Sequence, residues 1–390
     1  MSEKVIFVYL VHRCRGWEFM ASDEKSMVAD RIRNIRAKVN EIDRLLSTYE
    51  EKYKEKTGKT ALTIFLAYID RNIDWPDVGN LHLYLKGLKR EMIKNKVDEV
   101  HVILTSDGGD PNAAYLMSRV LHRFGQELKA NIIYVIPRFA KSAATLMALG
   151  GSEIRMTEVA ELGPVDPQVR FGDSWVSAKT LRSSMSSILQ AGLHSMYSFL
   201  QQQSNGIDQH TSQLLRTVVD VMIETTIKKF QVIGSHESYI EHMKQLAKEL
   251  LTLSMFPEEM KGTNQDRSRV DKIAKVMTEE FHSHGMAIDY QRAIELGLKV
   301  SKVDDELEDI LLDAFQIYMD ILRIIFLEIP GPRFMPYYWK MSRGMIVMEL
   351  PPDIVAMLSK MEEKGDRSPQ DGKDIPKNEQ ELKVGELAKQ

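Results

Sequence analysis

A serine at a predicted strand-to-helix turn is the first candidate for chemistry in this sequence. Ser142 follows the apolar, β-branched run Asn131–Ile136, which predicts a buried strand, and precedes a helix whose apolar positions are Leu146, Met147 and Leu149. The first N–H groups of a helix have no partner inside it, and the helix dipole is positive at that end. Such amides stabilise a tetrahedral oxyanion, so Ser142 is a candidate nucleophile. The alternative is that it serves only as the N-cap of the helix.

A glycine pair follows the preceding predicted strand, Val97–Thr105. The loop Ser106–Asp110 reads SDGGD. Glycine lets the backbone pass close to a ligand and turn an N–H toward it, which a side chain would obstruct. We therefore expect the amides of Gly109 and of Ala143, the residue after the serine, to form an oxyanion hole with two donors. An ordinary turn is the alternative for the two glycines.

Predicted strands and helices alternate around these loops. Strands are predicted at Leu62–Asp70, Val97–Thr105, Asn131–Ile136 and Glu153–Met156, and a helix at Val78–Asn95 lies between the first two. This alternation favours an α/β fold with a mainly parallel sheet and flanking helices. Ligands of such sheets bind beyond the carboxyl ends of the strands, so the glycine loop and the serine turn are expected to meet at one site.

The longest predicted helix runs from Asp23 to Thr57. Its apolar residues alternate in steps of four and three, and they are Val28, Ile32, Ile35, Val39, Ile42, Leu46, Tyr49 and Tyr53. A heptad stripe of this kind packs on another helix, either in the chain's own core or in a second subunit. The strict 3.5-residue period favours the second arrangement, and we predict a coiled-coil seam in a homo-oligomer.

Composition narrows the class of protein. The chain has 390 residues, 43% hydrophobic and 28% charged, with a net charge of −4 that argues against nucleic-acid binding. The single cysteine, Cys14, excludes an intrachain disulfide and a cysteine-rich metal site, and it fits a reducing compartment.

Val5–Val11 is interpreted as a strand rather than a signal peptide. Ile310–Ile329 is interrupted by charged residues, which predicts a buried or interface helix rather than a membrane span. A cytoplasmic location is predicted.

Four regions are predicted along the chain. Residues 1–58 hold an N-terminal strand and the long oligomerisation helix, and residues 59–300 form the catalytic domain. Residues 301–361 are a C-terminal extension of helix and strands. Residues 362–390 are rich in charged residues, glycine and proline, which predicts a disordered tail.

Three motifs in this order carry a family resemblance: Thr105–Asp110 (TSDGGD), Pro137–Leu146 (PRFAKSAATL) and Leu162–Gln168 (LGPVDPQ). They resemble the serine dehydrogenase proteinase family, which belongs to the ClpP/crotonase superfamily and is related to the signal peptide peptidase A group. The segments that begin at His284 and Ala293 resemble the same family, so the likeness covers about Leu62 to Val300. It implies a ClpP/crotonase-like fold and a serine peptidase with Ser142 as nucleophile. The family more often has glycine where Ala144 stands.

The resemblance leaves the general base open. ClpP proteases use a histidine within the motif that here spans Leu162–Gln168, where Asp166 occurs and histidine does not. Relatives of signal peptide peptidase A use a lysine, for which Lys179 is the best positional analogue. A lysine can act as base only if its pKa is lowered, and the alternative is a solvated surface amine. His284 is the second candidate base, or else simply a histidine at a helix end.

Other residues near these motifs are weaker candidates. Lys141 adjoins the serine, so its side chain is expected to point away from the site. Asp166 could orient the base or cap a turn. His282 and His284 lack a third metal ligand, and no metal is predicted. The sequence contains no glycine-rich dinucleotide fingerprint, and no cofactor is expected.

The leading functional hypothesis is therefore a cytoplasmic serine endopeptidase that acts on a peptide or protein substrate. Two alternatives stay open. One is a catalytically silent, oligomeric scaffold of the same fold. The other is a crotonase-like acyl-CoA enzyme, which shares the oxyanion hole but needs no serine nucleophile. A peripheral membrane or partner-protein association is possible but is not evident in the sequence.

Overall fold

The computed structural model describes the backbone over most of the chain. The described residues are 6–11, 22–69, 72–92, 96–166, 168–171, 174–177, 238–260, 268–281, 283, 285–328, 337–341 and 345–350, with scattered positions between 183 and 221. Cys14 and the tail predicted at 362–390 lie outside these residues. The predicted domain boundaries stay a prediction.

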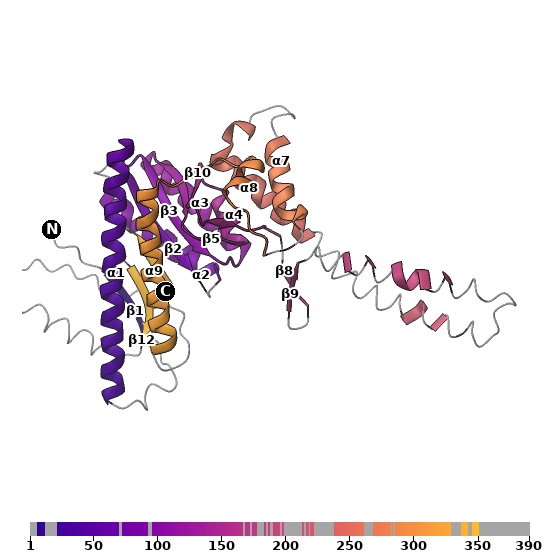
Figure 1. The fold of residues 1–390 in the computed structure, drawn as a ribbon, viewed down its shortest axis with the longest axis horizontal. Coiled ribbons are helices and arrows are strands. Elements are labelled where there is room, and N and C mark those ends of the chain that lie inside the picture. Colours follow the sequence, from indigo (N-terminus) through magenta and orange to yellow (C-terminus); the bar gives the residue numbers. More distant parts are fainter. Residues whose placement is uncertain are drawn as a thin grey trace, which may run out of the picture.

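A ten-stranded sheet forms the centre of the fold (Figure 1). Its main strands follow the spatial order β1-β12-β11-β2-β3-β4-β6-β10. Parallel pairing joins β2 (Ala61–Tyr68), β3 (Glu99–Ser106), β4 (Asn131–Ile136), β6 (Glu153–Met156) and β10 (Val300–Lys302). Antiparallel pairing joins β2 to β11 (Tyr337–Met341) and β11 to β12 (Met345–Leu350), and β1 (Ile6–Val11) lies parallel to β12 at the edge. The α/β class with a mainly parallel sheet is confirmed.

Helices cover both faces of this sheet. Every residue of β2 and of β3 is buried, as expected for parallel strands enclosed on both sides. Val102 and Leu104 join a core with α2 (Trp75–Met92), α3 (Pro111–Leu128) and α4 (Ala143–Ala148), whereas Ile103 between them joins a core with α1 (Ser22–Thr57) and α9 (Asp305–Glu328). Alternate strand residues point to opposite faces, so the two helix groups lie on opposite sides.

Shorter elements complete the first helix group. The strands β5 (Phe139–Ala140) and β7 (Glu161–Leu162) pair with each other, and β8 (Gln168–Phe171) and β9 (Ser174–Ser177) form a separate hairpin. Residues 238–250 are also helical, and further helical elements are the π-helical turns Leu251–Met255 and Val276–Glu280, the 3₁₀ turn Pro257–Met260, α7 (Ser268–Lys275) and α8 (Tyr290–Glu295).

The stripe of α1 packs inside its own chain, which corrects its interpretation as a seam between subunits. Its six described members, Ile35, Val39, Ile42, Leu46, Tyr49 and Tyr53, are at most 5% exposed and share one core with α9 and the sheet. The two helices lie side by side (Figure 1), and Lys38 Nζ is 2.9 Å from Asp320 Oδ2 while Lys56 Nζ is 2.9 Å from Asp304 Oδ1. This pairing is antiparallel. A helix pair within one chain needs the same period as a coiled coil, so the pattern alone could not choose the partner.

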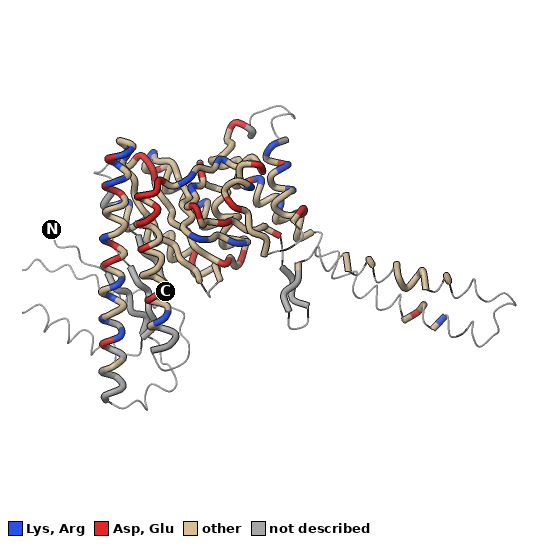
Figure 2. Tube along the Cα trace, viewed as in Figure 1, with Lys and Arg blue, Asp and Glu red and all other residues tan. Residues whose placement is uncertain are grey.

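Basic and acidic residues are interspersed along α1 (Figure 2). The apolar segment predicted as a buried helix is α9, and its prediction is confirmed because Leu311, Ala314 and Ile321 are at most 1% exposed. Among the helices that the structure describes, none is both long and apolar enough to cross a membrane. Homo-oligomerisation stays a prediction, but the stripe of α1 is no longer expected to form the interface between subunits.

Replacing Ile42 by alanine is expected to lower the free energy of unfolding by about 2–5 kcal/mol, because Ile42 is fully buried between α1 and the sheet. Denaturant unfolding of the whole chain measures the loss. Glu41→Ala, on the exposed side of the same helix turn, is the matched control, with an expected change within about 0.5 kcal/mol. If the Ile42→Ala variant instead formed a smaller assembly with unchanged stability, the stripe of α1 would form a seam between subunits after all.

Candidate active site

Ser142 occupies a strained turn between the sheet and α4. The chain leaves β4, forms β5 beside the end of β3, and enters α4 directly after the serine. Ser142 has φ 50° and ψ −119°, and among the described non-glycine residues only Lys129 also has a positive φ. Backbone of this kind costs about 1–3 kcal/mol and persists where the surroundings hold it, often at active sites. The side chain of Ser142 forms no capping hydrogen bond, so a role as N-cap alone is excluded.

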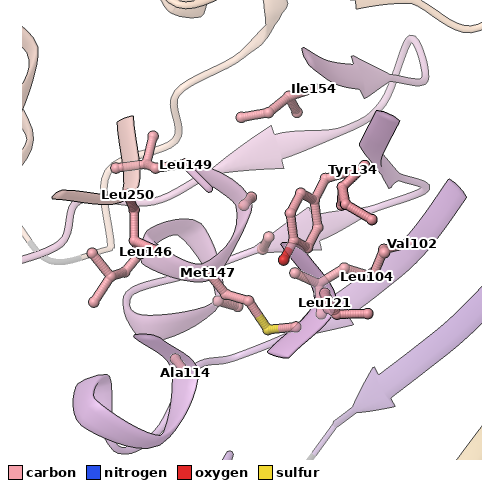
Figure 3. Packing of buried hydrophobic residues seen from close by; sticks show 14 of the residues in the cluster. Val102, Leu104, Ala114, Leu121, Tyr134, Leu146, Met147, Leu149, Ile154 and Leu250 are labelled. Atoms are coloured by element: carbon pink, nitrogen blue, oxygen red, sulfur yellow. The ribbon is translucent and has the colours of Figure 1, made fainter. Parts of the chain in front are cut away.

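The packing of α4 holds this turn in place. All six of its residues are buried, and Leu146 and Met147 lie in one apolar cluster with Tyr134 and Leu250 (Figure 3). Ser118 Oγ donates to the Met147 carbonyl at 2.9 Å, which fastens the end of the helix to α3. Because the helix is anchored on its apolar face, the turn that precedes it cannot relax without disturbing the core.

The glycine loop lies directly beside the serine, as predicted. A Cβ atom on Gly108 would stand 2.9 Å from Ser142 Cβ, so only glycine fits there. Gly108 and Gly109 have φ values of 116° and 147°, which L side chains rarely adopt. The backbone of Ile73 brackets the pair: its N–H donates to Gly108 O at 2.8 Å, and its carbonyl accepts from Asp110 N–H at 2.8 Å. Ile73 could not be predicted from its residue type, because it acts through its backbone.

The predicted oxyanion donors are the backbone amides of Gly109 and Ala143. Among the hydrogen bonds between described residues, none has either amide as its donor. Neighbouring amides are engaged, since Gly108 N–H donates to Ser106 Oγ at 3.0 Å and Ala144 N–H donates to Lys141 O at 2.9 Å. Two free N–H groups that flank a serine hydroxyl can stabilise an oxyanion.

The third motif closes the other side of the turn. Gly163 follows β7, and its N–H lies 3.0 Å from Ala140 O and 3.0 Å from Thr145 Oγ1. Thr145 Oγ1 in turn donates to Ala140 O at 2.5 Å. Sequence reasoning missed Thr145, whose only signal was its place inside the serine motif. Asp166 is 6% exposed and has an interaction partner, so its predicted role as turn cap or orienting group stays open.

Neither predicted base belongs to the described residues. Lys179 comes two positions after β9, and His284 comes four positions before Ile288; both, like His282, lie outside the described part of the chain. Ile288 exchanges two backbone hydrogen bonds of 2.9 Å with Leu162, so the segment that follows His284 is attached to β7. Within the described residues, no cluster of His, Cys, Asp and Glu side chains is suited to a metal ion.

Lys141 is engaged away from the serine. Its stem packs against Gly163, where a Cβ atom would stand 2.8 Å from Lys141 Cδ. Its Nζ forms an ion pair with Glu161 Oε1 at 2.5 Å, although the geometry of the two groups is not that of a hydrogen bond. The Lys141 ammonium is therefore paired with a carboxylate of β7.

A buried histidine elsewhere in the sheet is no substitute base. His101 is fully buried, with Nδ1 3.0 Å from the Tyr49 hydroxyl and Nε2 3.0 Å from Glu99 Oε2. Burial lowers the pKa of His101, and the bond to Glu99 opposes this only in part. Burial alone would raise the pKa of Glu99, but hydrogen bonds from His101 and Lys59 hold it well below its usual range. His101 lies five residues before Ser106, or about 17 Å along β3, so it anchors α1 and not the site.

Replacing Gly109 by alanine is expected to reduce kcat about 10²–10³-fold, the usual cost of losing one oxyanion donor. A Cβ atom at this position would overlap the backbone N and O of Ile73, so the loop must move away from the serine. Gly87→Ala, where a Cβ atom meets nothing within 4 Å, is the matched control and should keep full activity. Steady-state hydrolysis with thermal melts of both variants measures the effect, and an active Gly109→Ala protein would exclude this amide.

No protein-family model and no curated protein matches this chain. The solved structures that are similar to it include two of a protein described as 1510-N membrane-bound stomatin-specific protease. One is a serine-to-alanine mutant, with 13% identity, a TM-score of 0.32, and coverage of 75% of this chain and 98% of the other. The second is a lysine-to-alanine mutant in complex with a substrate peptide, with 12% identity, a TM-score of 0.33, and coverage of 77% and 98%. Because both TM-scores are below 0.5, these structures assign no role to any residue of this chain.

Proposed function

We propose that the protein is a serine endopeptidase of ClpP/crotonase type, with Ser142 as its nucleophile. The observation that carries the proposal is the backbone of Ser142, whose φ of 50° and ψ of −119° place a non-capping serine beside two free amides. A serine with a purely structural role would not need this strained conformation. A nucleophile gains exposure of its hydroxyl beside the oxyanion donors, as at the strained strand-to-helix turn of other hydrolases.

The reaction follows from this arrangement. Ser142 Oγ attacks the carbonyl carbon of a peptide bond while its proton passes to the base. The amides of Gly109 and Ala143 hold the oxyanion of the tetrahedral intermediate. When the intermediate collapses, the C–N bond breaks, and the protonated base gives its proton to the leaving amine. Water, deprotonated by the same base, then hydrolyses the acyl-enzyme and releases Ser142.

Lys179 is the proposed base and His284 its alternative. In the sequence, Lys179 follows the third motif and the β8–β9 hairpin, and His284 precedes Ile288, which pairs with Leu162 of that motif. A lysine base must be neutral when it accepts the proton, so it needs an apolar or cationic environment that lowers its pKa.

The two alternatives make different demands on the serine. A crotonase-like acyl-CoA enzyme would use the free amides for an enolate oxyanion and would not need a strained serine. A catalytically silent scaffold would need neither feature. The conformation of Ser142 therefore favours the peptidase over both.

Labelling with a fluorophosphonate probe tests the proposal. The full chain is expected to form a covalent adduct at Ser142, detected by peptide mass spectrometry, and heat-denatured protein is expected to form none. Ser187, an exposed serine in the described part of the chain, is an internal control that should stay unmodified. An intact protein without an adduct at Ser142 would exclude the peptidase and leave the scaffold or the acyl-CoA enzyme.

A cytoplasmic location and a homo-oligomeric state accompany this proposal. Neither follows from the single chain. Light scattering after gel filtration measures the mass of the assembly.

A further inference from the structure

Thr145 has a fully buried hydroxyl that joins two separate parts of the candidate site. It lies one helical turn after Ser142, and its exposed fraction is 0%. Its Oγ1 donates to Ala140 O at 2.5 Å and accepts from Gly163 N–H at 3.0 Å. A hydroxyl carries one donor and two acceptor sites, so both bonds can form together. Ser118 Oγ, which donates to Met147 O, ties the end of α4 to α3, whereas the Thr145 hydroxyl ties α4 to the neighbouring loops.

The first bond joins the residues that precede and follow the serine turn. Ala140 comes two residues before Ser142, and Thr145 comes three residues after it, so their hydrogen bond spans the strained residue. Ala140 is also paired with Ser106, and Lys141 N–H donates to Ser106 O at 2.9 Å. The bond therefore connects the serine turn with the start of the glycine loop.

The second bond reaches the third motif. Gly163 follows β7, whose Leu162 exchanges two backbone hydrogen bonds with Ile288. The Thr145–Gly163 bond is thus a side-chain link between the helix that follows the nucleophile and the strand β7.

We propose that Thr145 is a positioning residue, whose hydroxyl keeps the nucleophile turn aligned with β7 and the start of the third motif. This inference rests on the proposed peptidase function. Without the hydroxyl, the Gly163 N–H keeps only the Ala140 carbonyl as its acceptor, and the Ala140 carbonyl loses the hydrogen bond that Thr145 donates. The serine turn and β7 can then shift relative to each other, and a displacement near 1 Å reduces a reaction rate about 10²-fold.

Three variants of the full chain test the kinetic part. Thr145→Val keeps the shape and loses the hydroxyl, so kcat should fall about 10²-fold with little change in KM. Thr145→Ser restores the hydroxyl and should recover most of kcat. Thr157→Val is the matched control: Thr157 is also 0% exposed and donates to Pro137 O of the same turn at 2.7 Å, but it makes no bond to Gly163. Equal losses in the two valine variants, or no rescue by serine, would overturn the inference.

Hydrogen–deuterium exchange tests the link without catalysis. Peptides that cover residues 139–149 and 160–166 should exchange faster in Thr145→Val than in wild type, and at the wild-type rate in Thr145→Ser. Unchanged exchange in Thr145→Val would overturn the link. If the wild-type protein neither hydrolyses peptides nor reacts with the probe, the proposed function fails, whereas this exchange measurement still decides whether Thr145 holds the two segments together.

Discussion

Replacing Ser142 by alanine is expected to abolish peptide hydrolysis, with a loss in kcat on the order of 10⁶-fold, as for other serine peptidases that lose their nucleophile. Alanine has no oxygen to attack the carbonyl, and the free amides of Gly109 and Ala143 can bind the substrate carbonyl but cannot complete the reaction. The fold should be unaffected, because the Ser142 hydroxyl forms no capping hydrogen bond that would be lost.

A glycine at the same position separates function from strain. Ser142→Gly also removes the nucleophile, but glycine adopts φ 50° without the steric cost that serine carries. We expect Ser142→Gly to be as inactive as Ser142→Ala and more stable than wild type by about 1 kcal/mol, the part of the 1–3 kcal/mol strain that remains after the greater backbone entropy of glycine. Hydrolysis assays and denaturant unfolding of the three proteins measure both effects. Residual turnover in Ser142→Ala at the wild-type rate would place the activity at another residue.

The parts of the site that could be predicted from the sequence are those with a local cause. The Gly108-Gly109 pair was recognisable because close approach to another backbone requires glycine, and in the structure Gly109 lies against Ile73. The N-cap at Asp110 was also predictable: its Oδ1 accepts from Asn112 and Ala113 N–H at 2.8 and 3.0 Å. Such features depend on a few adjacent residues and so leave a pattern in the sequence.

Features that depend on distant partners left no such pattern. The apolar stripe of α1 has the same period whether it faces α9 or a second chain, and only the fold decides between them. A glycine late in a helical pattern is usually interpreted as the end of the helix, but Gly125 lies inside α3, which continues to Leu128 and ends with Lys129 in the left-handed conformation. Gly125 is instead required by close packing, since a Cβ atom there would stand 2.8 Å from Ala130 O. Thr145 is equally ambiguous, because a buried threonine hydroxyl has no signature before its partners are known.

Replacing the general base is also expected to have a large effect on activity. We expect Lys179→Ala to lose more activity than His284→Ala. Loss of a general base typically costs ~10²–10⁴-fold in rate. The positional resemblance to lysine-dependent peptidases motivates the order. Lys141, the described lysine beside Ser142, forms an ion pair with Glu161 at 2.5 Å.

Charge-conserving variants distinguish a base from an ion-pair partner. Lys179→Arg keeps the positive charge but cannot release its proton at working pH, so a proton-accepting role predicts that it is as inactive as Lys179→Ala. A purely electrostatic role predicts that arginine preserves the activity. His284→Gln keeps a hydrogen-bonding side chain without a titratable ring, and it should stay active if lysine is the base. The pH dependence of kcat/KM adds a check, because activity through either base is lost as pH falls below its pKa, about 6.5 for an unperturbed histidine. If His284→Gln alone is inactive while both Lys179 variants hydrolyse peptides normally, the catalytic pair is serine and histidine, and the expected order is wrong.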